Sequence, residues 1–365
     1  MINVAIVGLG NCASALVQGV HKYSHSNDTS GLVREQIGDI KVCDIAFKLA
    51  FDVDARKIGW PIQKAIFAGP NCCMPISPSV QDIDSERFSG PVLQGPLLDG
   101  VSEHMMTDDV NDFERFMVTP DSREPDAVHY AEILREYNIH ALINYLPVGS
   151  QKATEFWASV CLLARLPFVN CIPVFIASDP EWSYKFKQAR VALIGDDMKS
   201  QFGASILSQA FQELAKARGH KVKIHIQQNS GGNTDFLNMV NQDRLKSKKI
   251  SKENVLRDHG QVPDFVHAGP SDYIRVYGDT KVAHFHLELE GFCGAPVKLD
   301  ARLEVQDSPN SAGVVIDALR YVVTAQRRGL YGALEGPSAF TQKSPPRTMT
   351  LEESIMACDD LATKE

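Results

Sequence analysis

The sequence lacks the cysteine spacing of a zinc site or of a disulfide framework. Its eight cysteines are scattered, no two form a CxxC pair, and Cys72 and Cys73 are adjacent. Structural zinc sites and small disulfide-rich domains both need cysteines at recurring spacings. The eleven histidines include no HExxH motif. These absences predict reduced thiols and no metal site.

Long apolar runs and an excess of basic residues are also missing. No apolar stretch reaches the roughly 20 residues that cross a membrane, and the opening MINVAIVGLG is typical of a strand rather than of a signal peptide. The net charge of −8 disfavours a general nucleic-acid surface. We therefore expect a cytoplasmic protein whose partners are neither nucleic acid nor a membrane.

Short apolar runs alternate with helical patterns through the first half of the chain. With 365 residues, 44% of them hydrophobic, the chain can bury a large core and is expected to form two domains. Repeated strand–helix–strand patterns predict a parallel, doubly wound sheet. The expected strands are residues 3–7, 45–51, 141–145, 167–171 and 191–194, and the expected helices are 13–22, 126–137, 150–163 and 179–189. Residues 70–125, rich in Pro, Gly, Ser and Asp, interrupt this rhythm and are interpreted as an insertion.

The pattern changes after Met198. An amphipathic helix is expected to run to Arg218, with Gly219 placed to end it. Period-two alternation then predicts strands at 222–227, 281–290 and 297–305, in an antiparallel or mixed sheet with one face covered. The side chains expected to face inward from the last strand are Leu299, Ala301, Leu303 and Val305. A final helix is expected over 310–328, before Gly329.

A glycine turn follows the first strand. Gly8-Leu9-Gly10-Asn11-Cys12-Ala13 is a GxGxxA sequence between a strand and a helix. In such a turn the first glycine allows the bend, the second lets the backbone approach a pyrophosphate, and the helix N-terminus faces the phosphate charge. The position of the motif predicts a Rossmann-type dinucleotide site that includes Gly8, Gly10, Asn11 and Cys12, although a glycine turn without a ligand remains the alternative.

Asp52, at the end of the second long strand, is the candidate for the adenosine ribose hydroxyls. It lies about twice as far from the glycines as the usual spacing of roughly 20 residues, which an inserted polar loop at 21–39 explains. A carboxylate there favours NAD over NADP because it would repel a 2′-phosphate, and Asp54 is a competing choice. Pro147 and Gly149, after a later strand, could line the nicotinamide side or form a plain strand-to-helix turn.

The stretch 229–255, NSGGNTDFLNMVNQDRLKSKKISKENV, joins amides, a carboxylate and a lysine cluster. Asn229, Asn233 and Asp235 could hold a polyhydroxylated substrate, and Lys248 and Lys252 could meet its phosphate. The alternative is a polar turn that leads into a solvated basic helix.

Ten motifs occur in one order along the chain: GLGNCASALVQG, AFDVD, YLPVGS, FVNCIPVFIASDP, GDDMKSQFGA, GGNTDFLNM, SKKISK, GPSDY, VQDSPNSAG and QKSPP. With them the chain resembles the myo-inositol-1-phosphate synthases of the shorter prokaryotic type. The resemblance covers roughly the whole length and is weakest over 70–125 and the last twenty or so residues. It implies an NAD-dependent, redox-neutral cyclisation of a hexose phosphate by oxidation, enolisation, intramolecular aldol closure and re-reduction, most directly of glucose 6-phosphate to myo-inositol 1-phosphate.

The resemblance also implies roles for particular residues. The catalytic or phosphate-binding positions and their carboxylate partners would be Lys248, Lys252, Lys281, Lys343, Asp197 and Asp307. Substrate-binding positions would be Asn233, Asp235, Lys199 and Asp279, with Ser200 beside the cofactor. From the residues alone, Asp197 could equally be a helix N-cap and Lys281 an exposed strand residue. The sequence leaves open which lysine serves as base, and whether a divalent or monovalent cation assists.

The predicted fold is thus α/β, a Rossmann-type sheet with an inserted α+β domain. The NAD-binding domain would comprise residues 1–200 and 310–365, and the catalytic and oligomerisation domain residues 201–309. The resemblance implies a homotetramer built through the inserted sheet.

Five polar residues depart from the apolar or aromatic character expected beside the motifs, namely Gln228, Ser230, Thr234, Gln306 and Gln342. We interpret them as a sign of a reshaped pocket, which makes fructose 6-phosphate, closing to a five-membered cyclitol phosphate, an alternative substrate. A sugar-phosphate dehydrogenase and a non-catalytic NAD-binding regulator are the competing functional classes. Four lysines exceed what simple hydride transfer needs, and a regulator would be expected to have lost them.

Overall fold

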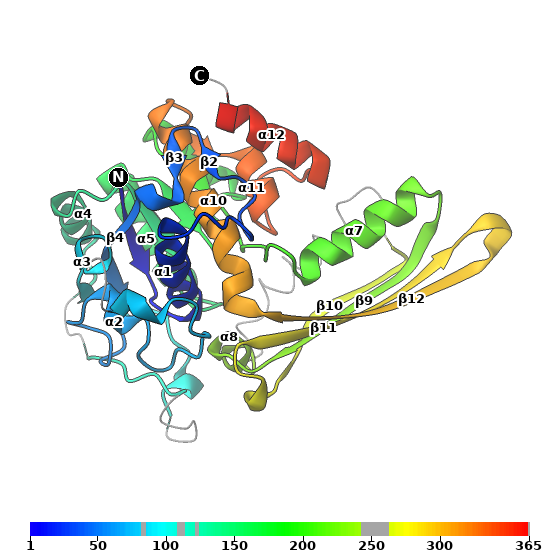
Figure 1. Cartoon of the computed structure of the whole chain (residues 1–365), viewed down its shortest axis with the longest axis horizontal. Helices are drawn as coiled ribbons and strands as arrows, with labels where there is room; N and C mark the ends of the chain where they lie inside the picture. Colours follow the sequence, from blue (N-terminus) through cyan, green and yellow to red (C-terminus); the bar gives the residue numbers. More distant parts are fainter. Residues whose placement is uncertain (82–84, 108–113, 121–123, 242–262, 364–365) are drawn as a thin grey trace.

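A parallel sheet of seven strands forms the centre of the larger body of the molecule (Figure 1). The computed structural model describes residues 1–81, 85–107, 114–120, 124–241 and 263–363. The strand order is β13-β8-β7-β6-β1-β4-β5, and every neighbouring pair is parallel. The strands are β1 (Ile2–Val7), β4 (Ile45–Asp52), β5 (Val92–Gln94), β6 (Ala141–Asn144), β7 (Phe168–Asn170), β8 (Ala192–Ile194) and β13 (Gly332–Ala333). This confirms the predicted doubly wound fold.

Helices cover both faces of this sheet, which is why its strands are apolar without interruption. Val4 and Ile6 of β1 pack in one core with α1 and α10, whereas Ala5 and Val7 pack in another with α4, α5 and α6. The helices are α1 (Asn11–Ser24), α4 (Ala127–Glu136), α5 (Gln151–Ala164), α6 (Pro180–Gln188) and α10 (Asp307–Arg327). Each helix predicted from the first half of the sequence is present, within two residues at either end.

The interval 70–125 is more than a loop. It contributes β5, which pairs with the C-terminal end of β4 and extends the sheet, and it contains the short helix α3 (Ser85–Phe88). Strand β5 is not predicted from the sequence because three residues are too few to show a period. The two-residue β13 is not predicted for the same reason.

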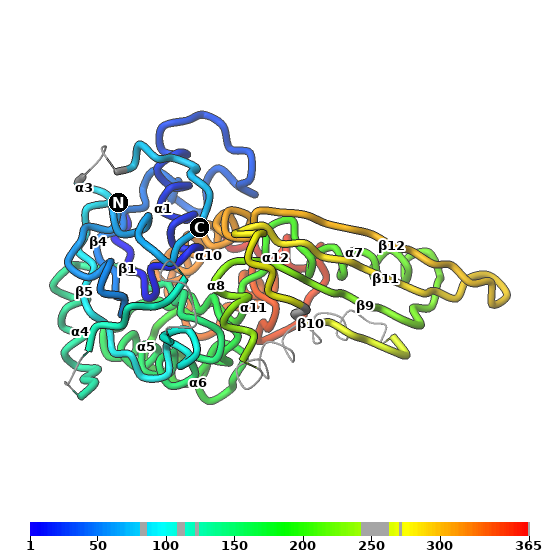
Figure 2. The backbone as a smooth tube through the Cα atoms, turned by 90° about the horizontal axis from the view of Figure 1, so that it is seen from below, coloured from blue at the N-terminus to red at the C-terminus, as the bar shows by residue number. Residues whose placement is uncertain are grey.

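A second sheet extends away from this body. Its order is β10-β9-β11-β12, with β10 parallel to β9 and the other pairs antiparallel (Figure 2). The strands are β9 (Lys221–Gly231), β10 (Phe265–Tyr273), β11 (Thr280–Glu290) and β12 (Pro296–Gln306). The sheet is therefore mixed, which is one of the two arrangements that the sequence predicted, and β10 was not foreseen.

Helix α7 (Ala204–Ala217) lies against one face of the second sheet. Phe285 and Leu287 of β11 form a small buried core beneath it. Three of the four β12 side chains predicted to face inward, Leu299, Ala301 and Leu303, pack against this core, but they remain half-buried. The fourth, Val305, is also half-buried but is not part of this core.

The chain returns to the body where β12 ends and α10 begins. Helix α10 starts at Asp307, three residues before its predicted start, so Pro309 lies in the first turn, where the helix requires no N–H donor. The predicted domain limits remain a prediction. Two further helices, α11 (Glu335–Thr341) and α12 (Leu351–Thr363), pack beside α10. None of the helices described here is long and apolar enough to cross a membrane.

Candidate active site

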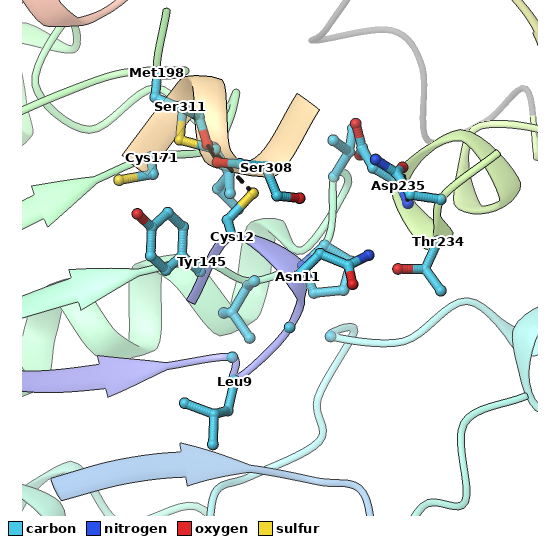
Figure 3. Close-up of a pocket in the computed structure, with 18 of the residues that line it drawn as sticks. Leu9, Asn11, Cys12, Tyr145, Cys171, Met198, Thr234, Asp235, Ser308 and Ser311 are labelled. Atoms are coloured by element: carbon cyan, nitrogen blue, oxygen red, sulfur yellow. Dashed lines mark hydrogen bonds between the residues drawn. The ribbon is translucent and has the colours of Figure 1, made fainter. Parts of the chain in front are cut away.

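A pocket lies where the C-terminal ends of the body strands meet the near end of the second sheet. Figure 3 shows Asn11 and Cys12, at the start of α1, across from Thr234 and Asp235 of α8 (Thr234–Asn238). Open parallel sheets commonly bind ligands at this edge. Predicted residues that line the pocket are Gly8, Gly10, Asn11, Cys12, Asp52, Pro147, Asp197, Ser200, Asn229, Asn233, Asp235, Lys281, Asp307 and Lys343.

The two glycines of the first turn serve different purposes. Gly8 has a φ of +83°, and a Cβ there would come within 2.7 Å of the Tyr145 carbonyl oxygen. Gly10 has an ordinary φ of −85°, and a Cβ there would have no neighbour within 4 Å among the described residues. In the described part of the chain, no side chain caps the first N–H groups of α1. Open space in front of uncapped N–H groups fits a dinucleotide pyrophosphate.

Asp52 lies under this turn and is held by backbone donors. Its Oδ2 accepts from the Leu9 N–H at 2.8 Å, and its Oδ1 accepts from its two following N–H groups. The competing candidate, Asp54, is fully buried away from the pocket wall and forms a two-point pair with Arg56. The geometry therefore favours Asp52 over Asp54.

Lys57 also lines the pocket, although the sequence did not predict it there. Its Nζ donates to the Leu9 carbonyl at 2.8 Å and to Asn71 Oδ1 at 3.1 Å, and it lies 3.8 Å from Asp52 Oδ2. Burial lowers the pKa of Lys57, and the charge of Asp52 opposes that shift. A lysine in a short irregular segment carries no periodic signal that could have predicted its burial.

The other residues predicted on the cofactor side are placed as follows. Asn11 Oδ1 accepts from the backbone N–H groups of Cys72 and Cys73, which fixes the loop beside the turn. Burial raises the pKa of Cys12 to about 12, so it remains a neutral thiol. Pro147 lines the pocket, whereas Gly149 shapes the turn before α5 with a φ of +86° and lies outside the wall.

One ammonium–carboxylate pair joins two distant segments. Lys343 Nζ donates to Asp197 Oδ1 at 2.8 Å. The backbones pair as well, since the Lys343 N–H donates to the Asp197 carbonyl, and Met198 and Gln342 form an antiparallel bridge. Asp197 has a φ of +62°, so it is part of a tight bend and not a helix N-cap.

A second pair forms where β11 and β12 meet α10. Lys281 Nζ donates to Asp307 Oδ1 at 3.1 Å, and burial, which opposes the positive charge, is outweighed by Asp307, so the pKa of Lys281 is raised. Asn233 donates to Asp279 at 3.1 Å and lies 3.5 Å from Asp307 Oδ2. Burial and the neighbouring Asp307 raise the pKa of Asp279 to about 6.

Not every predicted residue reaches the pocket. Lys199 is buried, and its Nζ donates to the Ala339 carbonyl at 2.6 Å, outside the pocket wall. Burial and the charge of Lys343 lower the pKa of Lys199 to about 8. Lys248 and Lys252 lie outside the described residues. Within the part of the chain described, no three His, Cys, Asp or Glu side chains group as metal ligands would.

The five polar departures do not form a reshaped pocket. Only Thr234 lines it. Gln228 and Ser230 alternate with Gln227 and Asn229 along β9, so their side chains are on the opposite face of the sheet. Gln306 is exposed and bonds Thr280, and Gln342 is buried beside Thr341. The interpretation that these residues reshape the site was therefore wrong for four of the five.

The loop after β5 connects the two halves of the pocket. His104 Nε2 lies 3.1 Å from the Leu237 carbonyl, and the Tyr273 hydroxyl donates to Glu114 at 2.6 Å. These contacts tie a body loop to α8 and to the end of β10, so the pocket is bounded by both sheets and by this loop.

The chain is similar to a known protein family and, over nearly its whole length, to proteins of known name. The family described as myo-inositol-1-phosphate synthase matches residues 203–308. The chain is 41% identical to the inositol-3-phosphate synthase of Mycolicibacterium smegmatis, over 100% of this chain and 96% of that protein. It is 42% identical to the inositol-3-phosphate synthase of Mycobacterium tuberculosis, over 95% of this chain and 92% of that protein.

Two solved structures share its fold. The crystal structure of Ari2 has 32% sequence identity and a TM-score of 0.75, and the match covers 99% of this chain and 98% of Ari2. A myo-inositol-1-phosphate synthase-related protein from Thermotoga maritima has 22% identity and a TM-score of 0.80, over 99% of this chain and 98% of that one. At this lower identity the second match shows the fold alone.

Proposed function

The chain belongs to the myo-inositol-1-phosphate synthase family, and from this we propose that it is the NAD-dependent cyclase that converts glucose 6-phosphate into an inositol phosphate. The reaction rearranges one hexose phosphate into an isomer, so no net oxidation accompanies it. A net dehydrogenase and a non-catalytic regulator are both disfavoured by this membership.

The cofactor would be held by the glycine turn, with Gly8, Gly10, Asn11 and Cys12 near its pyrophosphate and Asp52 near a ribose. Pro147 and Ser200 would line its other end. When bound, NAD would supply reversible hydride transfer, which would oxidise one carbon of the opened sugar to a ketone before ring closure and reduce it again afterwards. The remaining chemistry falls to the side chains of the chain.

The two ammonium–carboxylate pairs would stabilise the charge that develops on the sugar. A ketone next to a C–H bond makes that carbon acidic, and both the enolate and the aldolate that follow carry negative charge on oxygen. Ammonium groups that are already oriented in a site of restricted water stabilise such oxygens. Lys281 and Lys343 would do this, while Asp307 and Asp197 hold them in place. The predicted catalytic Lys248 and Lys252 lie outside the described residues.

The remaining polar residues would bind the substrate. Asn229, Asn233 and Asp235 line the pocket on the side of the second sheet, and amides with a carboxylate suit a chain of hydroxyl groups. The observation that carries the proposal is the meeting of a dinucleotide turn and both ammonium–carboxylate pairs at one pocket.

The test is incubation of the purified protein with NAD and either glucose 6-phosphate or fructose 6-phosphate, with products read by phosphorus NMR and mass spectrometry. We expect an isomeric inositol phosphate from glucose 6-phosphate and no accumulation of NADH. If only fructose 6-phosphate gave an isomeric product, fructose 6-phosphate would be the substrate and the proposed cyclisation chemistry would stand. Stoichiometric NADH would establish a dehydrogenase instead.

We also propose that the protein is a homotetramer assembled through the second sheet. Leu214 of α7 is 61% exposed, and the apolar residues Leu299, Ala301 and Leu303 are only half-buried on β12, the edge strand of the second sheet. A second copy could complete their burial, which stabilises association in proportion to apolar area. Light scattering after size exclusion should give about four times the mass of one chain. A monomeric mass for an active enzyme would contradict this arrangement.

A further inference from the structure

Buried polar side chains line the interface between α7 and β9, where an apolar interface would be expected. Ser208 and Gln212 extend from α7, and His225, Gln227 and Asn229 extend from β9. Each of the five is at most 3% exposed. Burying this many polar groups is costly unless all are hydrogen-bonded. Gln227 and Asn229 also line the pocket, so this polar set reaches the site.

The five side chains form one continuous row of hydrogen bonds that ends at a backbone carbonyl. Asn229 Nδ2 donates to the Gly269 carbonyl at 2.9 Å, and Asn229 Oδ1 accepts from Gln227 Nε2 at 3.1 Å. Gln227 Oε1 accepts from the Ser208 hydroxyl at 2.8 Å. His225 Nε2 lies 3.2 Å from that hydroxyl oxygen, and its Nδ1 lies 3.0 Å from Gln212 Nε2.

The carbonyl end fixes the direction of every bond in the row. A carbonyl only accepts, so Asn229 must present its NH₂ group to Gly269 and its oxygen to Gln227. Gln227 must then present its NH₂ group to Asn229 and its oxygen to Ser208. The Ser208 proton is thereby used, so Ser208 accepts from the Nε2–H of a neutral His225. Burial lowers the pKa of His225 to about 4, which keeps that form at neutral pH.

We propose that Gln227 is a positioning residue that holds the Asn229 amide in one orientation, and that this row makes the site selective for one hydroxyl group of the sugar phosphate. The inference rests on the proposed function for its substrate class. An amide free to rotate by 180° offers a donor or an acceptor to the same hydroxyl with little preference. An amide fixed at both ends offers one arrangement, and a site with fixed polar groups discriminates strongly against analogues that leave them unpaired.

Alternation along β9 supplies a matched pair of variants. Gln227→Met keeps length and volume but cannot donate to Asn229. Gln228→Met makes the same change one residue away, on the exposed opposite face. Ser208→Ala removes one hydroxyl from the middle of the row and is the second variant, in case Gln227→Met fails to fold.

The experiment measures kcat and KM, together with calorimetric binding to the NAD-loaded enzyme, for glucose 6-phosphate and for its analogues that each lack one hydroxyl. We expect Gln227→Met to raise KM for glucose 6-phosphate roughly tenfold to a hundredfold, with a smaller effect on kcat. The penalty should vanish for the one analogue that lacks the recognised hydroxyl. Ser208→Ala should show the same pattern more weakly, and Gln228→Met should match the wild type.

An equal loss for every analogue would mean a merely structural role and would overturn the proposal, as would an unchanged KM. A wild type that binds sugar phosphates without forming an isomeric product would sink the proposed function, while the binding comparison would still decide the role of Gln227. A wild type that binds none of these compounds would overturn both.

Discussion

Lys343 and Asp197 are 146 residues apart in the chain, yet Lys343 Nζ lies 2.8 Å from Asp197 Oδ1. The contact follows from backbone pairing between the segment after β8 and the segment after α11. Lys281 and Asp307 are joined similarly, by the β11–β12 ladder and the start of α10. Each ammonium is thus oriented by secondary structure before a substrate arrives. This limits the reorganisation that would otherwise weaken charge stabilisation.

Lys281→Ala should remove nearly all turnover and leave NAD bound. The variant removes the ammonium group that is paired with Asp307 at the pocket wall, and it leaves that carboxylate without its cation. Removal of a single stabilising donor of this kind lowers kcat by roughly 10²–10³-fold. Turnover should be measured by phosphorus NMR, and NAD affinity by calorimetry.

Lys298→Ala is the control for that variant, because Lys298 lies on the neighbouring strand β12 and its side chain is 62% exposed in a surface pair with Glu288. Exposed pairs contribute little to stability. Lys298→Ala should retain full activity. Near-normal turnover by Lys281→Ala would remove Lys281 from the catalytic set.

Gly8→Ala and Gly10→Ala should fail in different ways. Gly8→Ala places a Cβ 2.7 Å from the Tyr145 carbonyl at a positive φ, so we expect a lower melting temperature by several degrees. Gly10→Ala meets no atom of the described residues within 4 Å, so the fold should be retained while the new methyl group occupies the space for the pyrophosphate. NAD affinity should fall by about tenfold or more at an unchanged melting temperature. Equal melting temperatures for the two variants would contradict this division.

The sequence predicted the features of the fold that depend on local residue patterns. The Rossmann turn and the helices of the body depend on spacing within short segments, and they were found where expected. The Lys343–Asp197 pair could be suggested only by family resemblance, because a contact across 146 residues leaves no periodic signal. Lys57 was missed since its burial depends on Leu9 and Asn71, neither of which is near it in the chain. The error over Gln228 and Ser230 was avoidable, because side chains alternate between the two faces of a strand. This alternation places Gln228 and Ser230 on the face that Asn229 does not share.

Asp52→Asn should weaken the preference for NAD over NADP. Asp52 lines the pocket and would repel a 2′-phosphate, and Asn keeps its shape without the charge. We expect the ratio of NADP to NAD affinity to rise by about tenfold, which corresponds to roughly 1.4 kcal/mol. Asp54→Asn is the control. It weakens the buried pair with Arg56 and should lower stability without changing that ratio. If Asp54→Asn changed the ratio of NADP to NAD affinity more than Asp52→Asn does, Asp54 would be the residue that contacts the ribose.

Asp279→Asn should become more stable relative to the wild type as the pH rises from about 4 to above 6. Burial and Asp307 raise the pKa of Asp279 from 3.8 to about 6. In that interval the folded protein holds a proton that the unfolded chain releases, so rising pH destabilises the wild type. At about 1.4 kcal/mol per pH unit, the cost approaches roughly 3 kcal/mol above pH 6. Asn has no charge to bury, and the variant therefore escapes this cost.

The measurement is the difference in melting temperature between Asp279→Asn and the wild type, followed across this pH range. Other groups titrate in both proteins and cancel from the difference. Asp300→Asn, at a side chain that is 76% exposed on β12, should show no comparable trend. The activity of Asp279→Asn should be lower than that of the wild type, because the neutral amide cannot replace the carboxylate that accepts from Asn233 and Ser308. A flat difference would show that Asp279 ionises normally in the folded protein, and a falling one would mean that its negative charge stabilises the site.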